Sequence, residues 1–128
     1  MSYYIAKQTT GSFDETIDRV KEVLSSEGFG VLTEIDVKAT MKEKLGEDFR
    51  DYRILGACNP PFAHKALSAE DKIGTMLPCN VIVQSTGSNS VEIAAVDPVA
   101  SMAAVDNQSL APIAEEIRSR LARVIEQV

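Results

Sequence analysis

The sequence predicts one α+β domain, in which an antiparallel sheet of about five strands carries two main helices on one face. Length and composition set the scale, since 128 residues with 45% hydrophobic and 25% charged residues suffice for one domain with a real core. Two long segments space their apolar residues as amphipathic helices do, and shorter ones alternate or are continuously apolar, as strands are. Short connections favour antiparallel neighbours. We therefore expect the order strand, helix, four strands, helix, with short helical inserts, over residues 1–128.

In the N-terminal half, caps and periodicity mark the elements. A short strand at residues 3–5 precedes a capping box at residues 12–15, from which an amphipathic helix runs to Gly28. Residues 29–37 then alternate as a half-buried strand does, with Leu32 as an apolar exception on the polar side. A short helix at residues 40–45 is expected to end at Gly46.

The C-terminal half contains three more strands. Residues 52–58 form a buried strand that Pro60 ends, because proline has no N–H to donate, and a short helix at residues 62–67 follows. Residues 77–85 and 90–96 form a hairpin. Beyond it, Asp97 and Pro98 are typical of the N-cap and first position of a helix. The last helix holds one apolar stripe, made of Leu110, Ile113, Ile117, Leu121, Val124 and Ile125.

Charge and composition argue against several classes of protein. The net charge of −6 and the pI near 4.8 speak against a nucleic-acid partner, because binding to phosphates needs a cationic patch. The N-terminus lacks the features of a secretory signal, and no apolar run approaches the roughly 20 residues that span a bilayer. Two cysteines are too few for a secreted disulfide framework. We expect a cytoplasmic protein with free thiols.

A polar neighbourhood follows from the expected topology. If the last three strands form a meander, one edge of the sheet gathers the residues that end or begin them. This edge gives a candidate ligand pocket that consists of Cys58, Asn59, Cys79, Asn80 and Asp97. The insert that carries His64, the single histidine, passes nearby.

The two thiols allow different interpretations. Cys58, Cys79 and His64 could bind a soft metal such as zinc, or the thiols could support redox chemistry. Packing in the core is the favoured interpretation, because Cys58 shares strand parity with Ile54, and Cys79 shares it with the valines at 81 and 83. No C-x-x-C pair is present. Asp97 is better explained as a helix cap than as a catalytic acid, and each asparagine at a strand–loop junction commonly satisfies backbone groups.

Several segments occur in an order that resembles one family. They are residues 34–38 (EIDVK), 41–46 (MKEKLG), 52–60 (YRILGACNP), Ala63, Ala66-Leu67, 77–81 (LPCNV) and Asp97-Pro98. The series resembles the bacterial and archaeal "domain of unknown function 302" family over nearly the whole chain. The resemblance implies a compact α+β domain with a strongly curved antiparallel sheet, similar to the TATA-binding-protein-like fold class, and a tendency to dimerise. It implies neither DNA binding nor any catalytic residue.

Three hypotheses about function follow. The first is a homodimeric protein that binds a small ligand or another partner and has no catalysis of its own. The second is a thiol- or metal-dependent protein that uses Cys58, Cys79 and His64. The third makes the cysteine-containing segments a packing device at the edge of the sheet.

Overall fold

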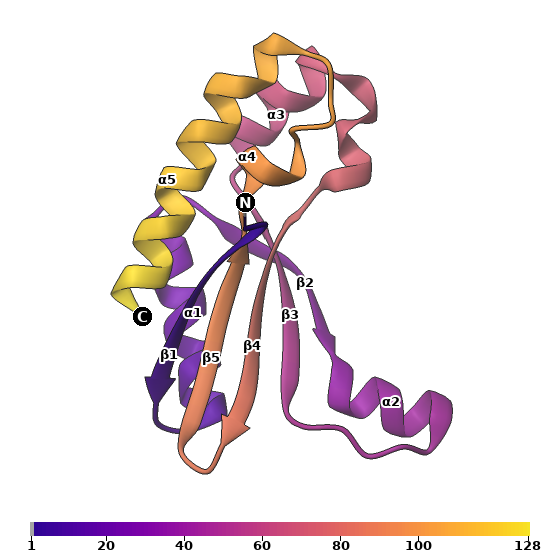
Figure 1. Ribbon diagram of the computed structural model, residues 1–128, viewed down its shortest axis with the longest axis vertical. Coiled ribbons are helices and arrows are strands. Elements are labelled where there is room, and N and C mark those ends of the chain that lie inside the picture. The colour runs from indigo at the N-terminus through magenta and orange to yellow at the C-terminus, as the bar shows by residue number, and fades with distance from the viewer. Residues whose placement is uncertain (1) are drawn as a thin grey trace.

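The computed structural model describes residues 2–128 and contains five strands and several helices (Figure 1). The strands are β1 (Tyr4–Thr10), β2 (Gly30–Asp36), β3 (Tyr52–Cys58), β4 (Cys79–Gly87) and β5 (Ser90–Val96). The α-helices are α1 (Phe13–Ser26), α2 (Val37–Leu45), α3 (Pro60–Ala69), α4 (Pro98–Ser101) and α5 (Ala111–Gln127). Two 3₁₀ helices complete the fold, η1 (Asp71–Met76) and η2 (Gln108–Leu110). The predicted α+β class and element order are confirmed.

All strand pairs in the sheet are antiparallel, and the strand order is β1-β5-β4-β3-β2. The predicted meander therefore exists as β2-β3-β4-β5, and β1 adds to its far side. The first strand is longer than the sequence predicted, because residues 4–10 all pair with β5. The sheet stays open and is not curled up on itself (Figure 1).

Both long helices cover a single face of the sheet, as predicted. Ser12 caps α1 by accepting a hydrogen bond from the N–H of Glu15, and the helix buries Ile17, Val20 and Leu24. The stripe on α5 packs beside it. Between these helices and the sheet lies the main core, to which β3, β4 and β5 contribute Leu55, Val81, Val83, Val91, Ile93 and others.

The edge strand β2 differs from its prediction. A β-bulge lies between Val31 and Thr33. Val31 pairs with Ala57 of β3 and Thr33 pairs with the next residue, Gly56, so β2 has one residue more than β3 at this point. Leu32 is the extra residue, which explains why it broke the alternation. After the bulge, Ile35 lies on the exposed side of the sheet and Glu34 faces α1, where it binds Lys21. The predicted alternation through residue 37 is therefore wrong beyond the bulge.

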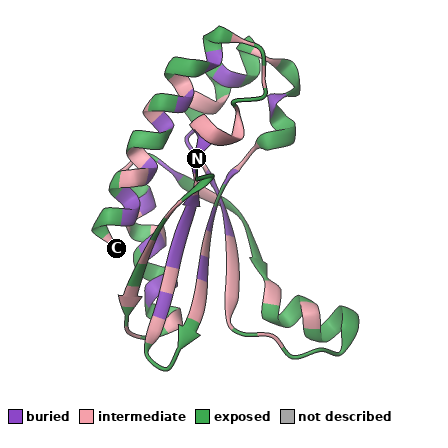
Figure 2. Ribbon diagram, viewed as in Figure 1, coloured by how far each residue is buried: buried purple, intermediate pink, exposed green. Residues whose placement is uncertain are grey.

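A short helix follows β2 directly. The strand ends at Asp36, whose carboxylate accepts a hydrogen bond from the N–H of Ala39 and so starts α2 at Val37, three residues before the predicted start. Gly46 ends α2 in the left-handed conformation, with a φ of 67°. α2 projects from the lower end of the sheet and buries none of its residues (Figures 1 and 2).

At the opposite end of the sheet, four short elements form a cap. α3, α4 and η2 lie beside the first turns of α5, and η1 packs against α3 (Figure 1). Their buried residues Ala66, Ile73 and Leu110 make a second, much smaller core, which the half-buried Leu77, Met102, Val105 and Ile113 extend. We call this group of elements the cap. No helix in the described part of the chain is long and apolar enough to cross a membrane.

Candidate functional site: an apolar cavity between the sheet and the cap

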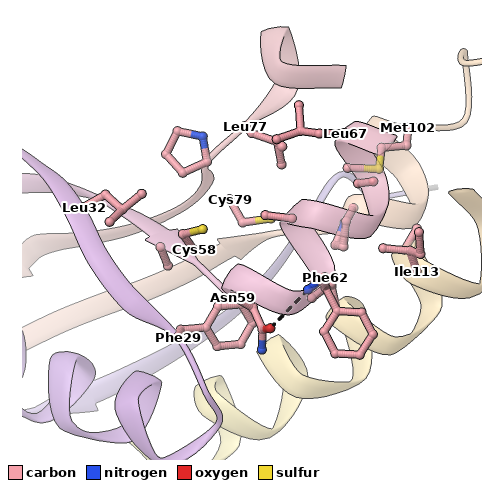
Figure 3. A pocket seen from close by; sticks show the side chains of 17 residues that line it. Phe29, Leu32, Cys58, Asn59, Phe62, Leu67, Leu77, Cys79, Met102 and Ile113 are labelled. Atoms are coloured by element: carbon pink, nitrogen blue, oxygen red, sulfur yellow. Dashed lines mark hydrogen bonds between the residues drawn. The ribbon is translucent and has the colours of Figure 1, made fainter. Parts of the chain in front are cut away.

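A cavity of about 290 Å³ lies between the main core and the cap. Its floor comes from the ends of β2, β3 and β4, and its walls come from α3, α4 and α5 (Figure 3). One side of the cavity is lined by residues of the cap and of the segments beside it, namely Leu67, Leu77, Met102 and Ile113. The other side is lined by the main-core residues Phe29 and Ala57. No charged side chain of the described residues lines this cavity, whose polar members are Asn59 and the two cysteines.

Asn59 holds the start of α3. Its side-chain Oδ1 accepts a hydrogen bond from the N–H of Phe62 at 3.5 Å, and the residue is only 6% exposed. The amide Nδ2 lies against Gly28, where a Cβ atom would be 3.1 Å away. Gly28 has a φ of +86° and carries no side chain, so it leaves room for this amide. The carbonyl oxygen of Asn59 is therefore engaged by the start of α3, and its amide nitrogen packs against the backbone at Gly28.

Cys58 and Cys79 both line the cavity and have different surroundings. Cys79 is buried in the main core, and burial, followed by the neighbouring Cys58, raises its pKa to about 11. Cys58 is half-buried at the end of β3. Both thiols are free, and Figure 3 places the two sulfur atoms among apolar side chains.

The prediction that Cys58 faces the core is wrong. Leu55 and Ala57 are the members of β3 that enter the main core, whereas Ile54 is only half-buried and faces away from α1 and α5. Cys58 shares parity with Ile54 and so lies outside the main core. For Cys79 the predicted parity with Val81 and Val83 is correct, because all three are core residues.

Asp97 lies outside this cavity and serves as a helix cap. Its Oδ1 accepts hydrogen bonds from the N–H groups of Val99 and Ala100, and its Oδ2 accepts one from Nε of Arg118 at 2.9 Å. Burial opposes ionisation of this carboxyl, but the bonds from Arg118, Ala100 and Val99 outweigh it and lower the pKa below its ordinary value. The capping role preferred from the sequence agrees with this geometry.

The remaining candidates are also separate from the cavity. Asn80 is exposed on the face of the sheet opposite α1 and α5. His64 is exposed on α3 and does not line the cavity. In residues 2–128, no group of three or more His, Cys, Asp or Glu side chains could hold a metal ion. The structure thus brings Cys58, Asn59 and Cys79 together and leaves Asn80, Asp97 and His64 elsewhere.

Sequence reasoning missed the apolar walls of the site. Phe29, Phe62, Met102 and Ile113 come from four separate segments, and each fits an ordinary core pattern when it is taken alone. One signal was available on α3, where two alanines, Ala63 and Ala66, lie on the helix face turned to the cysteine-containing segments. Alanines on a helix leave space where larger side chains would fill it.

Comparison with known proteins identifies what the chain is similar to. The model of the family described as "Domain of unknown function DUF302" matches residues 5–128. Among solved structures, the chain is similar to that described as "Crystal structure of uncharacterized conserved protein DUF302 from Bacillus stearothermophilus". The two share 30% sequence identity and a TM-score of 0.91, over 99% of this chain and 98% of that one. None of the curated proteins compared with the chain matches it.

Proposed function

Because the chain belongs to the DUF302 family, whose description gives no activity, we propose a function from the site itself: non-catalytic binding of a small molecule, by a homodimer. The observation that carries the binding function is the cavity between the main core and the cap. Its volume of about 290 Å³ lies at the lower end of the roughly 300–1,000 Å³ typical of ligand sites.

The lining of the cavity favours binding over catalysis. General acid–base chemistry needs a titratable group near the working pH, within reach of the substrate. No charged side chain of the described residues lines the cavity. The thiol of Cys79 has a pKa of about 11 and is protonated at neutral pH, which makes it a poor nucleophile. The alternative, a thiol- or metal-dependent function that uses Cys58, Cys79 and His64, has no comparable observation in its favour, because His64 does not line the cavity with the two cysteines.

One face of the sheet, turned away from α1 and α5 and here called the open face, supports the homodimer. On the open face, residues that are cross-strand partners form one apolar row across all five strands. The members of this row are Ala6, Ala94, Ile82, Ile54 and Ile35. Ile35 is 47% exposed, and beside the row Tyr4 is 48% exposed. A continuous apolar row on an open sheet face is typical of a protein interface.

The size of this surface favours a second copy of the chain as the partner. Five strands at about 4.8 Å and seven residues at about 3.3 Å give a face of roughly 550 Å², to which the projecting α2 adds. A standard interface buries about 800 Å² on each partner. The face and α2 together therefore approach the area that a dimer interface needs. The charges on α2 add no argument for or against this partner, because Lys38 and Lys42 already pair with Asp51 and Asp48 of the same chain. The two free thiols are consistent with a cytoplasmic location.

The binding function is tested with a panel of small neutral, anionic and cationic fragments. Binding is followed by ligand-observed NMR on the wild type and on Ala63→Phe, which places a phenyl ring in the cavity from α3. Ala69→Phe is the matched control, because Ala69 is exposed on the same helix and does not line the cavity. We expect at least one fragment to bind the wild type and the control but not Ala63→Phe. If no fragment distinguishes these proteins, the proposed function is wrong.

A further inference from the structure

The cavity has a chemical character that restricts its ligand beyond the general function proposed above. We infer that it takes a neutral, predominantly apolar molecule of about ten non-hydrogen atoms, such as a fused aromatic ring system, held between the main core and the cap. This inference rests on the proposed function and names the class of its ligand.

The electrostatics of the lining exclude ions. A charged ligand loses its hydration on entering and needs a protein charge or several hydrogen bonds in return. The described residues offer no charged side chain in the lining of the cavity. Two cations, Arg120 and Lys65, lie over the ring of Phe62 at 5.2 and 5.1 Å from its centroid, and neither lines the cavity. The Asn59 carbonyl oxygen is already bonded to the start of α3. The thiols of Cys58 and Cys79 are only weak partners for hydrogen bonds.

The volume sets the size of the ligand. An apolar cavity of 150 Å³ lined by aliphatic and aromatic side chains is known to bind benzene in another protein. This cavity, at about 290 Å³, is about twice as large. At the roughly 30 Å³ that a water molecule occupies in the liquid, it accommodates about ten non-hydrogen atoms. A two-ring aromatic compound matches that number, whereas an extended long-chain lipid exceeds it.

The architecture supplies a way in. The cap side of the cavity rests on a second core to which the described residues contribute three buried side chains, against sixteen in the main core on the sheet side. Elements with few buried apolar contacts open locally at low free-energy cost. Leu32 on the bulge and Leu67 on α3 both line the cavity and are 69% and 44% exposed, which places them at its mouth (Figure 3). A bound ring would join the two cores through contacts on both sides.

The test uses three probes that share one ring system and differ in charge. They are 2-naphthalenemethanol, 2-naphthoate and 2-naphthylmethylammonium, titrated against the full chain at pH 7 with detection by naphthalene fluorescence. We expect the alcohol to bind with a micromolar dissociation constant, at least about tenfold more tightly than either ion, because each ion would be buried without a partner. Ala63→Phe should abolish binding of the alcohol, and Ala69→Phe should leave it unchanged.

A second readout locates the probe without relying on a variant that must fold. Cys58 lines the cavity and is half-buried, so a bound alcohol should slow its alkylation by iodoacetamide by at least about fivefold at a saturating concentration. Binding without protection of Cys58 would place the probe elsewhere and overturn the inference.

The possible outcomes separate the two proposals. If an ion binds as tightly as the alcohol, protects Cys58 and is lost in Ala63→Phe, the inferred ligand class is wrong while the cavity remains a binding site. If none of the three probes binds, the inferred class is overturned, and the proposed function then depends on the wider fragment panel.

Discussion

Asp97 accepts hydrogen bonds from two backbone N–H groups of α4 and from the Nε of Arg118 on α5. A residue just after the last strand therefore fixes two elements of the molecule, both of which contribute to the cavity wall. Asn59 does the same for α3 after β3. Asn59 and Asp97, two of the three polar residues that the sequence placed near the site besides the cysteines, thus shape it by binding backbone N–H groups, whereas Asn80 does not.

Substitution of Asp97 separates its two contacts. Asp97→Ala removes the cap and the ion pair, and we expect it to cost about 2 kcal/mol in the free energy of unfolding at pH 7. Asp97→Asn keeps a capping oxygen and loses the charge, so it should cost about 1 kcal/mol, since Arg118 is half exposed. Urea denaturation of the three proteins measures both differences. Equal costs for Asn and Ala would contradict the capping role.

Ionisation of the Asp97 carboxyl should make the stability difference between the wild type and Asp97→Asn depend on pH. The folded pKa of Asp97 is lowered, so its stabilisation is fully present above the unfolded pKa of about 3.9 and is lost as the pH falls through the folded pKa. The stability advantage of the wild type over Asp97→Asn should therefore be constant from pH 5 to 7 and shrink below about pH 4. Denaturation curves across this range test it, and an unchanged advantage at the lowest pH would refute it.

The two thiols should react at very different rates. The pKa of Cys79 rises from 9.0 to about 11, which lowers its thiolate fraction at pH 8 about a hundredfold, and the side chain is buried as well. We expect one thiol per chain to react quickly with Ellman's reagent in the native protein. Cys58→Ala should remove this fast phase and Cys79→Ala should leave it. A fast phase that persists in Cys58→Ala would show that Cys79 is accessible.

At the scale of elements, β2 and the segment before β4 both pack closely against β3 at Gly56. This residue of β3 pairs with Thr33 on β2 and Asn80 on β4. A Cβ atom there would overlap the Thr33 side chain and lie 2.7 Å from Cγ of Pro78. The strand therefore needs glycine for space between neighbouring elements.

Gly56→Ala should destabilise the protein by about 1–3 kcal/mol, because the added methyl group forces β2 and the segment before β4 apart. Gly30→Ala is the matched control, since a Cβ at Gly30 meets nothing within 4 Å, and it should change stability by no more than about 0.5 kcal/mol. Thermal or urea unfolding measures both. Similar effects for the two substitutions would mean that the close packing at Gly56 does not limit stability.

The elements also show what a sequence can predict here. The caps at Ser12 and Asp97 and the antiparallel meander follow from local patterns, because each depends on residues a few positions apart. The orientation of Ile35 and the face of Cys58 do not, because the bulge at Leu32 decides the first and the choice of which face of β3 the long helices cover decides the second. The cavity depends on where α5 and the cap meet the sheet, which no single segment encodes. The residue types expected at the site were polar, whereas its walls are mainly apolar.

At the scale of the whole molecule, helices cover one face of the sheet and leave the open face with its apolar row, while α2 projects from the sheet with every residue at least partly exposed. Figure 2 shows that the buried residues concentrate in the central strands and under α5, away from α2. This asymmetry leaves an apolar row on a face that neither long helix covers, which is why we propose a second copy there.

Ile82 lies at the middle of the apolar row, on the central strand of the sheet. We expect the wild type to sediment at micromolar concentration as a dimer of two 13.9 kDa chains, and Ile82→Lys to sediment as a monomer. A lysine pair at the centre of the interface would be buried without partners. Ser119→Lys, on the exposed side of α5, is the control and should remain dimeric. A monomeric wild type would contradict the dimer, and a dimeric Ile82→Lys would contradict this interface.

The bulge at Leu32 has a consequence for how this protein tolerates changes in length. On either side of it, β2 pairs with β3 in a register that would be continuous if Leu32 were absent, so the chain carries one residue more than the ladder requires. An extra residue inside a strand normally shifts the pairing of all residues after it and turns their side chains to the other face of the sheet. Here the bulge accommodates Leu32 locally, and the pairs after it remain in register with β3. Its side chain stands at the mouth of the cavity. One extra residue in an edge strand thus supplies part of the cavity lining while the rest of the sheet keeps its pairing.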